Sequence, residues 1–344
     1  MVESVASDLI PRLARPLPWH AGAVSQLACA WSRQHFPHAL LLHGPQGVGK
    51  RELAAWLAAS ILCDVNSTEL GRCGDCASCK LITAGSHPDL LWVHPEQDKQ
   101  QISVDQIRAV SERLYKTSYR RGYKVAVVEP AHQVTAAGAN ALLKTLEEPP
   151  ARSLLLLVSS QPSTLPATVC SRCQRLAVPR PSSAAALSWL QQQQVSVDAS
   201  LLEFAAGGPL RALAFAGASF TNLDQEMQRS LTELFRGDAD VTQVAGQWCK
   251  ESLPERLVWL DLWLTSNARG ALTRNAAAVT FPTRSAHLPS LPRAANISSV
   301  YEMVDRVRSL KAQLARTALQ RELAVESWLL TLLDVFNADL SRPT

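Results

Sequence analysis

The chain has 344 residues, of which 47% are hydrophobic and 19% are charged, and its net charge is +4. This length exceeds one compact core, because domains usually hold about 100–200 residues, so we expect two or three domains. The mild positive charge is compatible with nucleic-acid contact but is no evidence for it. No apolar stretch approaches the ~20 residues that span a bilayer, and the first twenty residues have no signal-peptide core. We therefore expect a cytoplasmic protein without a membrane span.

The first half of the chain alternates short apolar runs with helical patterns. Buried strands are predicted at residues 39–43 (ALLLH), 124–128 and 154–158. Helices are predicted after Lys50, after Ser103, which has capping-box spacing to Gln106, and from Ala136 up to the prolines at 149–150. Strands that alternate with helices predict a parallel sheet covered on both faces.

The second half of the chain, beyond the prolines at 179–181, is almost entirely helix-forming. It predicts a small helical block at about 182–217 that ends near Gly207-Gly208-Pro209, and then a larger helical block. The larger block contains a Pro-rich loop at 282–292 and one or more helices over about 297–338. One apolar stripe on this last segment predicts helix-bundle core, and it consists of Met303, Val304, Val307, Leu310 and Leu314. The glutamines at 191–194 predict a loop or a helix end.

A glycine-rich loop, GPQGVGK, lies between the first strand and its helix. In a P-loop, glycines let backbone N–H groups close on phosphate oxygens, and a lysine reaches the terminal phosphates. Gly44, Gly49 and Lys50 satisfy the G-x-x-x-x-G-K pattern, and Gly47 adds flexibility. The strand-loop-helix context favours a P-loop over an unrelated glycine turn.

Two departures from the pattern argue against ATP hydrolysis. Arg51 stands where a working P-loop has a Ser or Thr that ligates magnesium, and a fixed positive charge repels that ion. P-loop ATPases of the AAA+ kind also place Asp-Glu after a buried strand, but here Glu129-Pro130 follows the strand at 124–128. Proline cannot act as the water-activating base, whose loss costs ~10²–10⁴-fold in rate. We infer a degenerate ATPase site. The alternative is that the Asp-Glu position is displaced by one residue from Glu129-Pro130. Whether ATP or ADP still binds at Lys50 is left open.

Half of the eight cysteines cluster in the sequence, at Cys63, Cys73, Cys76 and Cys79. Two overlapping C-x-x-C steps and one preceding cysteine suit a tetrahedral, structural zinc ion. An iron–sulfur cluster and unliganded core cysteines are the alternatives. We favour zinc, because the segment interrupts a nucleotide-fold domain with no redox partner in view and because its charged and small residues are poor core neighbours.

A Ser-Arg-Cys segment follows the third predicted strand. Arg172 alone predicts an ordinary salt-bridged arginine, although an arginine on a domain edge can enter a neighbouring subunit's ATP site and stabilise charge during transfer. Cys170 and Cys173 form a C-x-x-C, for which buried cysteines are favoured over a redox pair.

Together these motifs resemble the delta-prime family of clamp-loader subunits of bacterial DNA polymerase III. The resemblance covers residues 17–178 densely, including the four-cysteine module, His87-Pro88-Asp89, the segment at 102–108, the long run at 140–150 (NALLKTLEEPP) and Ser171-Arg172-Cys173. Beyond it, only helical character and residues 207–211 (GGPLR) match.

The resemblance implies a fold class and three domains. These are an AAA+ domain with its zinc module at 63–79 in residues 1–178, a small helical lid in 179–217, and a helical collar for oligomerisation in 218–344. It also implies assembly into a hetero-oligomer with gamma or tau motor subunits and a delta subunit, which acts on a sliding clamp and primed DNA. Arg172 would then serve as an arginine finger in trans. Motor subunits share the zinc module and the LKTLEEPP run, so Arg51 and Pro130 distinguish a stator from a motor.

Three functions are therefore weighed. The first is a non-hydrolysing stator of the clamp loader. The second is an active gamma-like AAA+ motor, which needs another magnesium ligand despite Arg51. The third is a zinc-dependent nucleic-acid-binding adaptor, for which a steep salt dependence of DNA binding is expected. Only the segment at 115–121 (YKTSYRR) interleaves aromatic and basic residues, and it predicts a helix end.

Overall fold

The chain divides into two compact units, Met1–Ser182 and Ser183–Thr344. A computed structural model describes residues 16–65, 69–96, 99, 101–120, 122–195, 197, 199–216, 218–250, 252–273, 297–314 and 321–340. The further domain boundary expected at residue 217 stays a prediction, and that residue lies outside the described ones. The same holds for the Pro-rich loop expected at 282–292.

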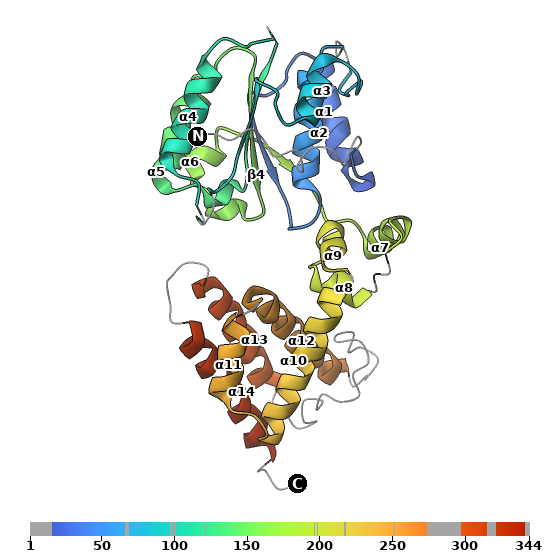
Figure 1. Cartoon of the computed structure of the whole chain (residues 1–344), viewed down its shortest axis with the longest axis vertical. Coiled ribbons are helices and arrows are strands. Elements are labelled where there is room, and N and C mark those ends of the chain that lie inside the picture. Colours follow the sequence, from blue (N-terminus) through green and yellow to red (C-terminus); the bar gives the residue numbers. More distant parts are fainter. Residues whose placement is uncertain are drawn as a thin grey trace. The chain divides into compact units, whose positions relative to one another are not determined.

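The N-terminal unit is an α/β structure built on five parallel strands in the order β2-β3-β4-β1-β5 (Figure 1). The strands are β1 (Ala39–His43), β2 (Leu90–Val93), β3 (Lys124–Val128), β4 (Ser153–Ser159) and β5 (Gln174–Ala177). The helices are η2 (Pro18–His20), α1 (Ala21–Ser32), α2 (Lys50–Leu62), α3 (Ala77–Thr83), α4 (Val104–Tyr115), η3 (Ala131–Gln133), α5 (Ala136–Glu147), η4 (Pro162–Thr164) and α6 (Ala167–Cys170).

Helices cover both faces of this sheet. Figure 1 shows α1, α2 and α3 on one side of β4 and α4, α5 and α6 on the other. Side chains alternate along β1: Leu40 and Leu42 belong to the apolar cluster that includes α2, whereas Ala39 and Leu41 belong to the cluster that includes α4 and α5. This alternation follows from the two-residue period of a strand. The expected P-loop α/β domain with a parallel sheet is confirmed.

The three strands predicted from apolar runs are confirmed, and two further strands were missed. β2 has only four residues, which is short for a periodicity argument. β5 lies at an edge of the sheet, where only Leu176 is buried, so it has no continuous apolar run. Both strands that were not predicted are short, and they are defined by their pairing with neighbouring strands in the sheet.

Local capping explains the helix boundaries that the sequence predicted. The Ser103 hydroxyl accepts a hydrogen bond from the Gln106 N–H at 3.3 Å, and the Gln106 side chain accepts one from the Ser103 N–H at 3.0 Å. This is the predicted capping box at the start of α4. The Thr135 hydroxyl caps α5, which ends before the prolines at 149–150.

The second unit is helical throughout its described residues. Its helices are α7 (Ser183–Gln192), α8 (Ala199–Phe204), α9 (Pro209–Phe215), α10 (Ala218–Arg236), α11 (Val241–Lys250), α12 (Leu253–Thr273), α13 (Ile297–Leu314) and α14 (Arg321–Leu340). The predicted stripe on α13 packs in its core, with Met303 and Val307 almost fully buried and Leu314 partly so, beside Trp259 and Trp263. The helical class expected for this half is confirmed. None of the described helices combines the length and the apolar character that a membrane crossing requires.

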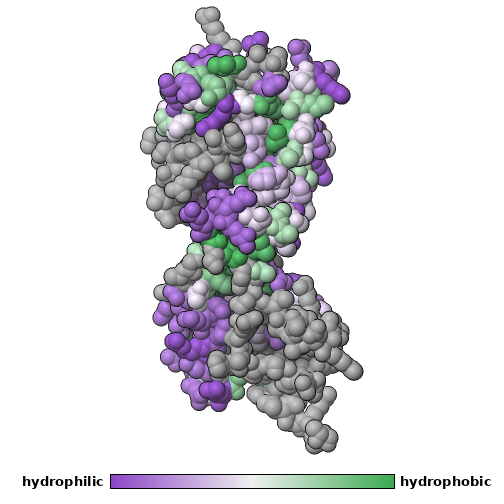
Figure 2. Space-filling model, turned by 90° about the vertical axis from the view of Figure 1, so that its right-hand side faces the viewer, coloured by the Kyte–Doolittle hydropathy of each residue, from purple (hydrophilic) through white to green (hydrophobic). Residues whose placement is uncertain are grey.

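The surface of the N-terminal unit is mixed in character. Figure 2 shows hydrophilic side chains interspersed with apolar ones on the face that it draws. Among the described residues, the most exposed large apolar side chains of this unit are Tyr119, at 79% exposure, and Val65, at 66%. Both lie close in sequence to the residues that surround the cysteine cluster described below.

Candidate metal centre and degenerate nucleotide cradle

The glycine loop lies between the end of β1 and the start of α2, as the sequence predicts. A Cβ atom at Gly44 would lie 2.1 Å from the carbonyl oxygen of Val178, so the close approach of two chain segments requires glycine. Gly47 and Gly49 have φ angles of 73° and 86°, which glycine adopts without strain. The structure therefore places Gly44, Gly47, Gly49 and Lys50 in one tight loop between β1 and α2, at positions where glycine is favoured.

The ammonium group of Lys50 is held by the loop itself. Its Nζ donates hydrogen bonds to the carbonyl oxygen of Gly44 at 2.9 Å and to that of Pro45. Burial lowers the pKa of Lys50 to about 8, although the nearby carboxylates of Glu129 and Glu52 oppose the shift. The lysine thus has acceptors within its own loop.

Arg51 pairs with the acid that follows β3. The Nε atom of Arg51 lies 3.2 Å from Oε2 of Glu129, and the indole N–H of Trp92 donates to the same oxygen at 3.3 Å. The guanidinium carbon lies 5.9 Å from the centroid of the Trp92 ring. Burial raises the pKa of Glu129, and the positive charge of Arg51 opposes that rise. A fixed cation therefore neutralises the only carboxylate of the expected Asp-Glu pair, and Pro130 follows it.

Residues that precede α1 support the loop from outside, and no sequence pattern predicted this role. The Trp19 indole N–H and the His20 Nε2 both lie 2.8 Å from the carbonyl oxygen of Val48. Since His20 Nδ1 accepts from the N–H of Leu17, its Nε2 is the donor, and burial lowers the pKa of His20, which favours this neutral tautomer. The Pro-Trp-His run at 18–20, just before α1, was the available signal.

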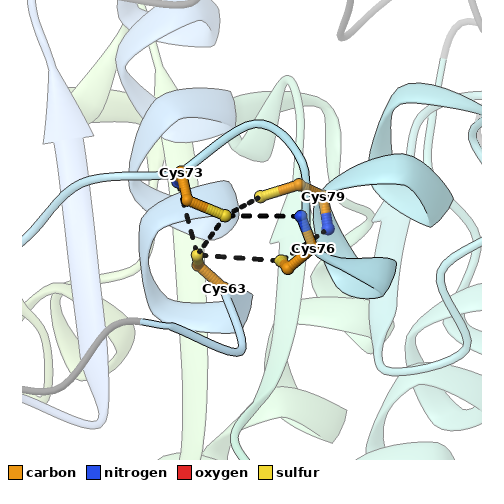
Figure 3. Close-up of side chains that lie close together, drawn as sticks. All are labelled: Cys63, Cys73, Cys76 and Cys79. Atoms are coloured by element: carbon orange, nitrogen blue, oxygen red, sulfur yellow. Dashed lines mark hydrogen bonds between the residues drawn. The ribbon is translucent and has the colours of Figure 1, made fainter.

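The four clustered cysteines converge on one point (Figure 3). Cys63 follows α2, Cys73 lies in the loop, and Cys76 and Cys79 lie at the start of α3. The Sγ atom of Cys63 lies 3.6 Å from that of Cys73 and 3.9 Å from that of Cys76, and the Cys73 and Cys79 sulfurs are 4.0 Å apart. All four sulfurs lie within 4.8 Å of one another.

These distances fit a tetrahedral metal site. Zinc–sulfur bonds of ~2.3 Å in a tetrahedron place the sulfurs about 3.8 Å apart, and the three distances of 3.6–4.0 Å are close to that spacing. Backbone N–H groups of Cys73, Cys76 and Cys79 donate to the sulfurs of Cys63, Cys73 and Cys76 at 3.3–3.4 Å, as suits thiolates. The four sulfurs could therefore hold a metal ion, and their closed set leaves no position for a substrate.

Arg172 lies apart from the cysteine module, beside the helices of the other sheet face. It follows α6, and its Nη2 lies 2.7 Å from Oε1 of Glu147 at the end of α5. Its side chain is 37% exposed. The neighbouring Cys170 and Cys173 are buried in the apolar cluster around α5, and burial raises the pKa of Cys173 to about 12, which argues against a reactive thiolate.

Comparison with known proteins connects these features to one family. Residues 19–182 match the family model "DNA polymerase III, delta subunit", and residues 221–334 match "DNA polymerase III, delta subunit, C terminal". DNA polymerase III subunit delta' of Pseudomonas aeruginosa is 36% identical over 262 residues, which cover 75% of this chain and 79% of that protein. The chain belongs to the DNA polymerase III delta-prime family. The Escherichia coli delta-prime subunit is 33% identical over 320 residues, which cover 91% of this chain and 94% of that protein.

A differently named subunit also matches part of the chain. DNA polymerase III subunit tau of Bacillus subtilis is 32% identical over 200 residues, which cover 54% of this chain and 35% of that protein. The delta-prime subunits of Pseudomonas aeruginosa and Escherichia coli, by contrast, match over most of both chains. The resemblance inferred from the motifs to the delta-prime family is confirmed.

Proposed function

We propose that this delta-prime chain is a non-hydrolysing stator subunit of the clamp loader, which works in the cytoplasm. In this role it assembles with gamma or tau motor subunits and a delta subunit into a hetero-oligomer that loads the sliding clamp on primed DNA. Its own chemical contribution is Arg172, which acts as an arginine finger in a neighbour's ATP site.

The ion pair between Arg51 and Glu129 carries the stator part of the proposal. A magnesium ion in a P-loop site needs oxygen ligands and a net negative field. Here the guanidinium stands 3.2 Å from the carboxylate that would attract the ion. The ion pair leaves Glu129 unavailable as a magnesium ligand, and Pro130 has no side-chain base. The site therefore lacks both a metal ligand and a base.

The state of Lys50 supports the same conclusion. Its ammonium already donates to the carbonyls of Gly44 and Pro45, and burial lowers its pKa to about 8. A nucleotide phosphate would have to replace these internal hydrogen bonds to engage the lysine. We therefore expect binding of ATP or ADP to be weak.

The assignment of Arg172 as the finger is supported by its position. It lies at the surface beyond α6 with much of its side chain exposed, and a guanidinium always keeps its charge. Arginine fingers contribute ~10³–10⁵-fold to the rate at the site that they enter. The segment Ser171-Arg172-Cys173 is also one of the motifs on which the resemblance to the family rests.

The cysteine site is proposed to hold structural zinc. Cys63, Cys73, Cys76 and Cys79 would be the ligands, and the ion would supply binding energy that orders the segment between α2 and α3. No chemical step in ATP hydrolysis is assigned to it.

The experiment compares the chain alone with the complex reconstituted from its partner subunits. Alone, it should show negligible ATPase activity, with or without primed DNA. In the complex, Arg172→Ala should depress both ATPase activity and clamp loading, whereas Arg180→Ala, which removes another exposed arginine of the same unit, should leave both unchanged.

Three results would contradict the proposal. Vigorous ATPase activity by the chain alone would establish the motor function instead. Structure-specific DNA binding by the isolated chain, with a steep salt dependence, would favour the nucleic-acid adaptor. Full activity of the complex with Arg172→Ala would remove the finger role.

A further inference from the structure

A carboxylate and a backbone carbonyl hold the guanidinium of Arg172. Its Nη2 lies 2.7 Å from Oε1 of Glu147, and its Nη1 donates to the carbonyl oxygen of Thr168 at 2.9 Å. A weaker contact at 3.5 Å joins Nη1 to the Ser171 hydroxyl. Because the guanidinium is planar, anchors on both of its terminal nitrogens fix the orientation of the whole group.

Both anchors lie on a rigid part of the unit. Glu147 follows Leu146, and Thr168 precedes Val169, and these two apolar neighbours are buried in the same apolar cluster on one face of the sheet. The prolines at 149–150 end α5 directly after the acidic pair. The guanidinium is therefore held against two packed helices, and its position does not depend on a free loop.

Helix stability gives no reason for an acid at position 147. Glu147 is the last residue of α5, where the negative end of the helix dipole disfavours a carboxylate. Arg172 offsets that charge, and it also donates to the Thr168 carbonyl in the last turn of α6, which accepts a second hydrogen bond from the Ser171 hydroxyl at 3.1 Å. Glu147 thus stabilises the position of Arg172 and does not stabilise its own helix.

We propose that Glu147 is a positioning residue for Arg172, which holds the guanidinium in the orientation in which it enters the neighbouring ATP site. This inference rests on the proposed finger role. The anchors engage one N–H of each terminal nitrogen, and the side chain is still 37% exposed, so further N–H donors remain for phosphate oxygens. Without Glu147 the long side chain samples several rotamers, and only a fraction of the population is aligned.

The test uses the reconstituted complex and two neighbouring acids. Glu147→Ala removes the anchor, and Glu148→Ala removes an equal charge from the next, exposed residue, which has no ion pair among the described contacts. We expect Glu147→Ala to lower the kcat of the ATPase about two- to fivefold, since a half-exposed ion pair biases a side chain by about that factor. The KM for ATP, the assembly of the complex and its thermal midpoint should not change, and Glu148→Ala should match the wild type.

The double variant separates positioning from a structural effect. In an Arg172→Ala background, adding Glu147→Ala should cause no further loss, because there is no guanidinium left to orient. Equal activity of Glu147→Ala and Glu148→Ala, a rise in kcat with Glu147→Ala, or losses that add in the double variant would each overturn the inference. If Arg172→Ala itself leaves the complex fully active, the finger proposal fails first and this inference falls with it.

Discussion

The Ser78 hydroxyl donates a hydrogen bond to Oδ1 of Asp64 at 2.7 Å, and the Ser78 N–H donates to Oδ2 at 3.0 Å. Asp64 directly follows Cys63, and Ser78 directly precedes Cys79. These hydrogen bonds therefore join the two ends of the cysteine module at 63–79. Arg120 donates to the same carboxylate, and the imidazole of His87 lies 3.2 Å from the Ser78 hydroxyl. The module is thereby joined to the segments that precede β2 and β3.

Asp89 forms the inner part of this network. It is only 2% exposed, and its carboxylate accepts hydrogen bonds from the Ser118 hydroxyl and from the N–H groups of Tyr119 and Arg120 at 2.9–3.0 Å. Asp89→Ala leaves these donors without an acceptor, so we expect a loss of about 2–4 kcal/mol in the free energy of unfolding. Urea unfolding measures this loss, with Asp105→Ala, an exposed acid on α4, as the control. A loss equal to that of the control would show that the network is dispensable.

The cysteine site makes a prediction about metal content. We expect one zinc ion per chain, measured by elemental analysis, and Cys79→Ser should lose it because three thiolates bind far more weakly than four. Cys29→Ser, which changes an exposed cysteine outside the cluster, should keep the metal. Visible absorption of a thiolate-bound iron cluster, or a protein that is folded and metal-free as isolated, would contradict the assignment.

Most of the site could be predicted from the sequence because its residues form motifs that are contiguous in the chain. The P-loop and the cysteine cluster follow from spacing alone, because their residues are close together in the chain and bind through local geometry. The sequence also predicted that Arg51 repels magnesium. The structure adds that Arg51 forms an ion pair with Glu129. That pairing joins residues on different strands and helices, so no local spacing could predict it.

The parts that were missed depend on contacts between distant segments. β5 is recognisable only by its pairing with β1, since Leu176 is its sole buried residue. The roles of Trp19 and His20 depend on the Val48 carbonyl, which lies almost thirty residues later in the chain. The run His87-Pro88-Asp89 entered as part of a resemblance, and only the structure gives it a physical role in the network around Ser78.

Replacing Arg51 should make stability depend more strongly on pH than it does in the wild type. Burial raises the pKa of Glu129 and Arg51 opposes the rise, so Arg51→Leu should raise this pKa further. A folded-state pKa above the unfolded value means that stability is lost as pH rises from the unfolded pKa towards the folded one. We expect the variant to lose about 1–3 kcal/mol at neutral pH and less near pH ~4, where Glu129 is protonated. Urea unfolding at both values measures this.

A second substitution checks the cause. Arg51→Leu/Glu129→Leu removes both charges, and replacing a partly buried ion pair by apolar side chains is often close to neutral. The double variant should therefore recover much of the stability that Arg51→Leu loses. Equal losses in the single and double variants would show that Arg51 acts through packing on Trp92 and not through its charge.

Lys50, in the glycine loop, should make the free energy of unfolding depend on pH in the opposite direction. Burial lowers the pKa of Lys50 from 10.5 to about 8, so between these two values the unfolded chain holds a proton that the folded chain lacks. The free energy of unfolding should then rise with pH across this window, whereas below about pH 8 the lysine is charged in both states and adds no slope. Lys50→Met lacks this group, so the stability of the wild type relative to Lys50→Met should increase from pH 8 to 10.5. Lys144→Met, on an exposed position of α5, corrects for general effects of losing a charge. If the difference between the wild type and Lys50→Met is constant over this range, the lysine is not held in a desolvating environment, and its hydrogen bonds to Gly44 and Pro45 do not keep it away from solvent.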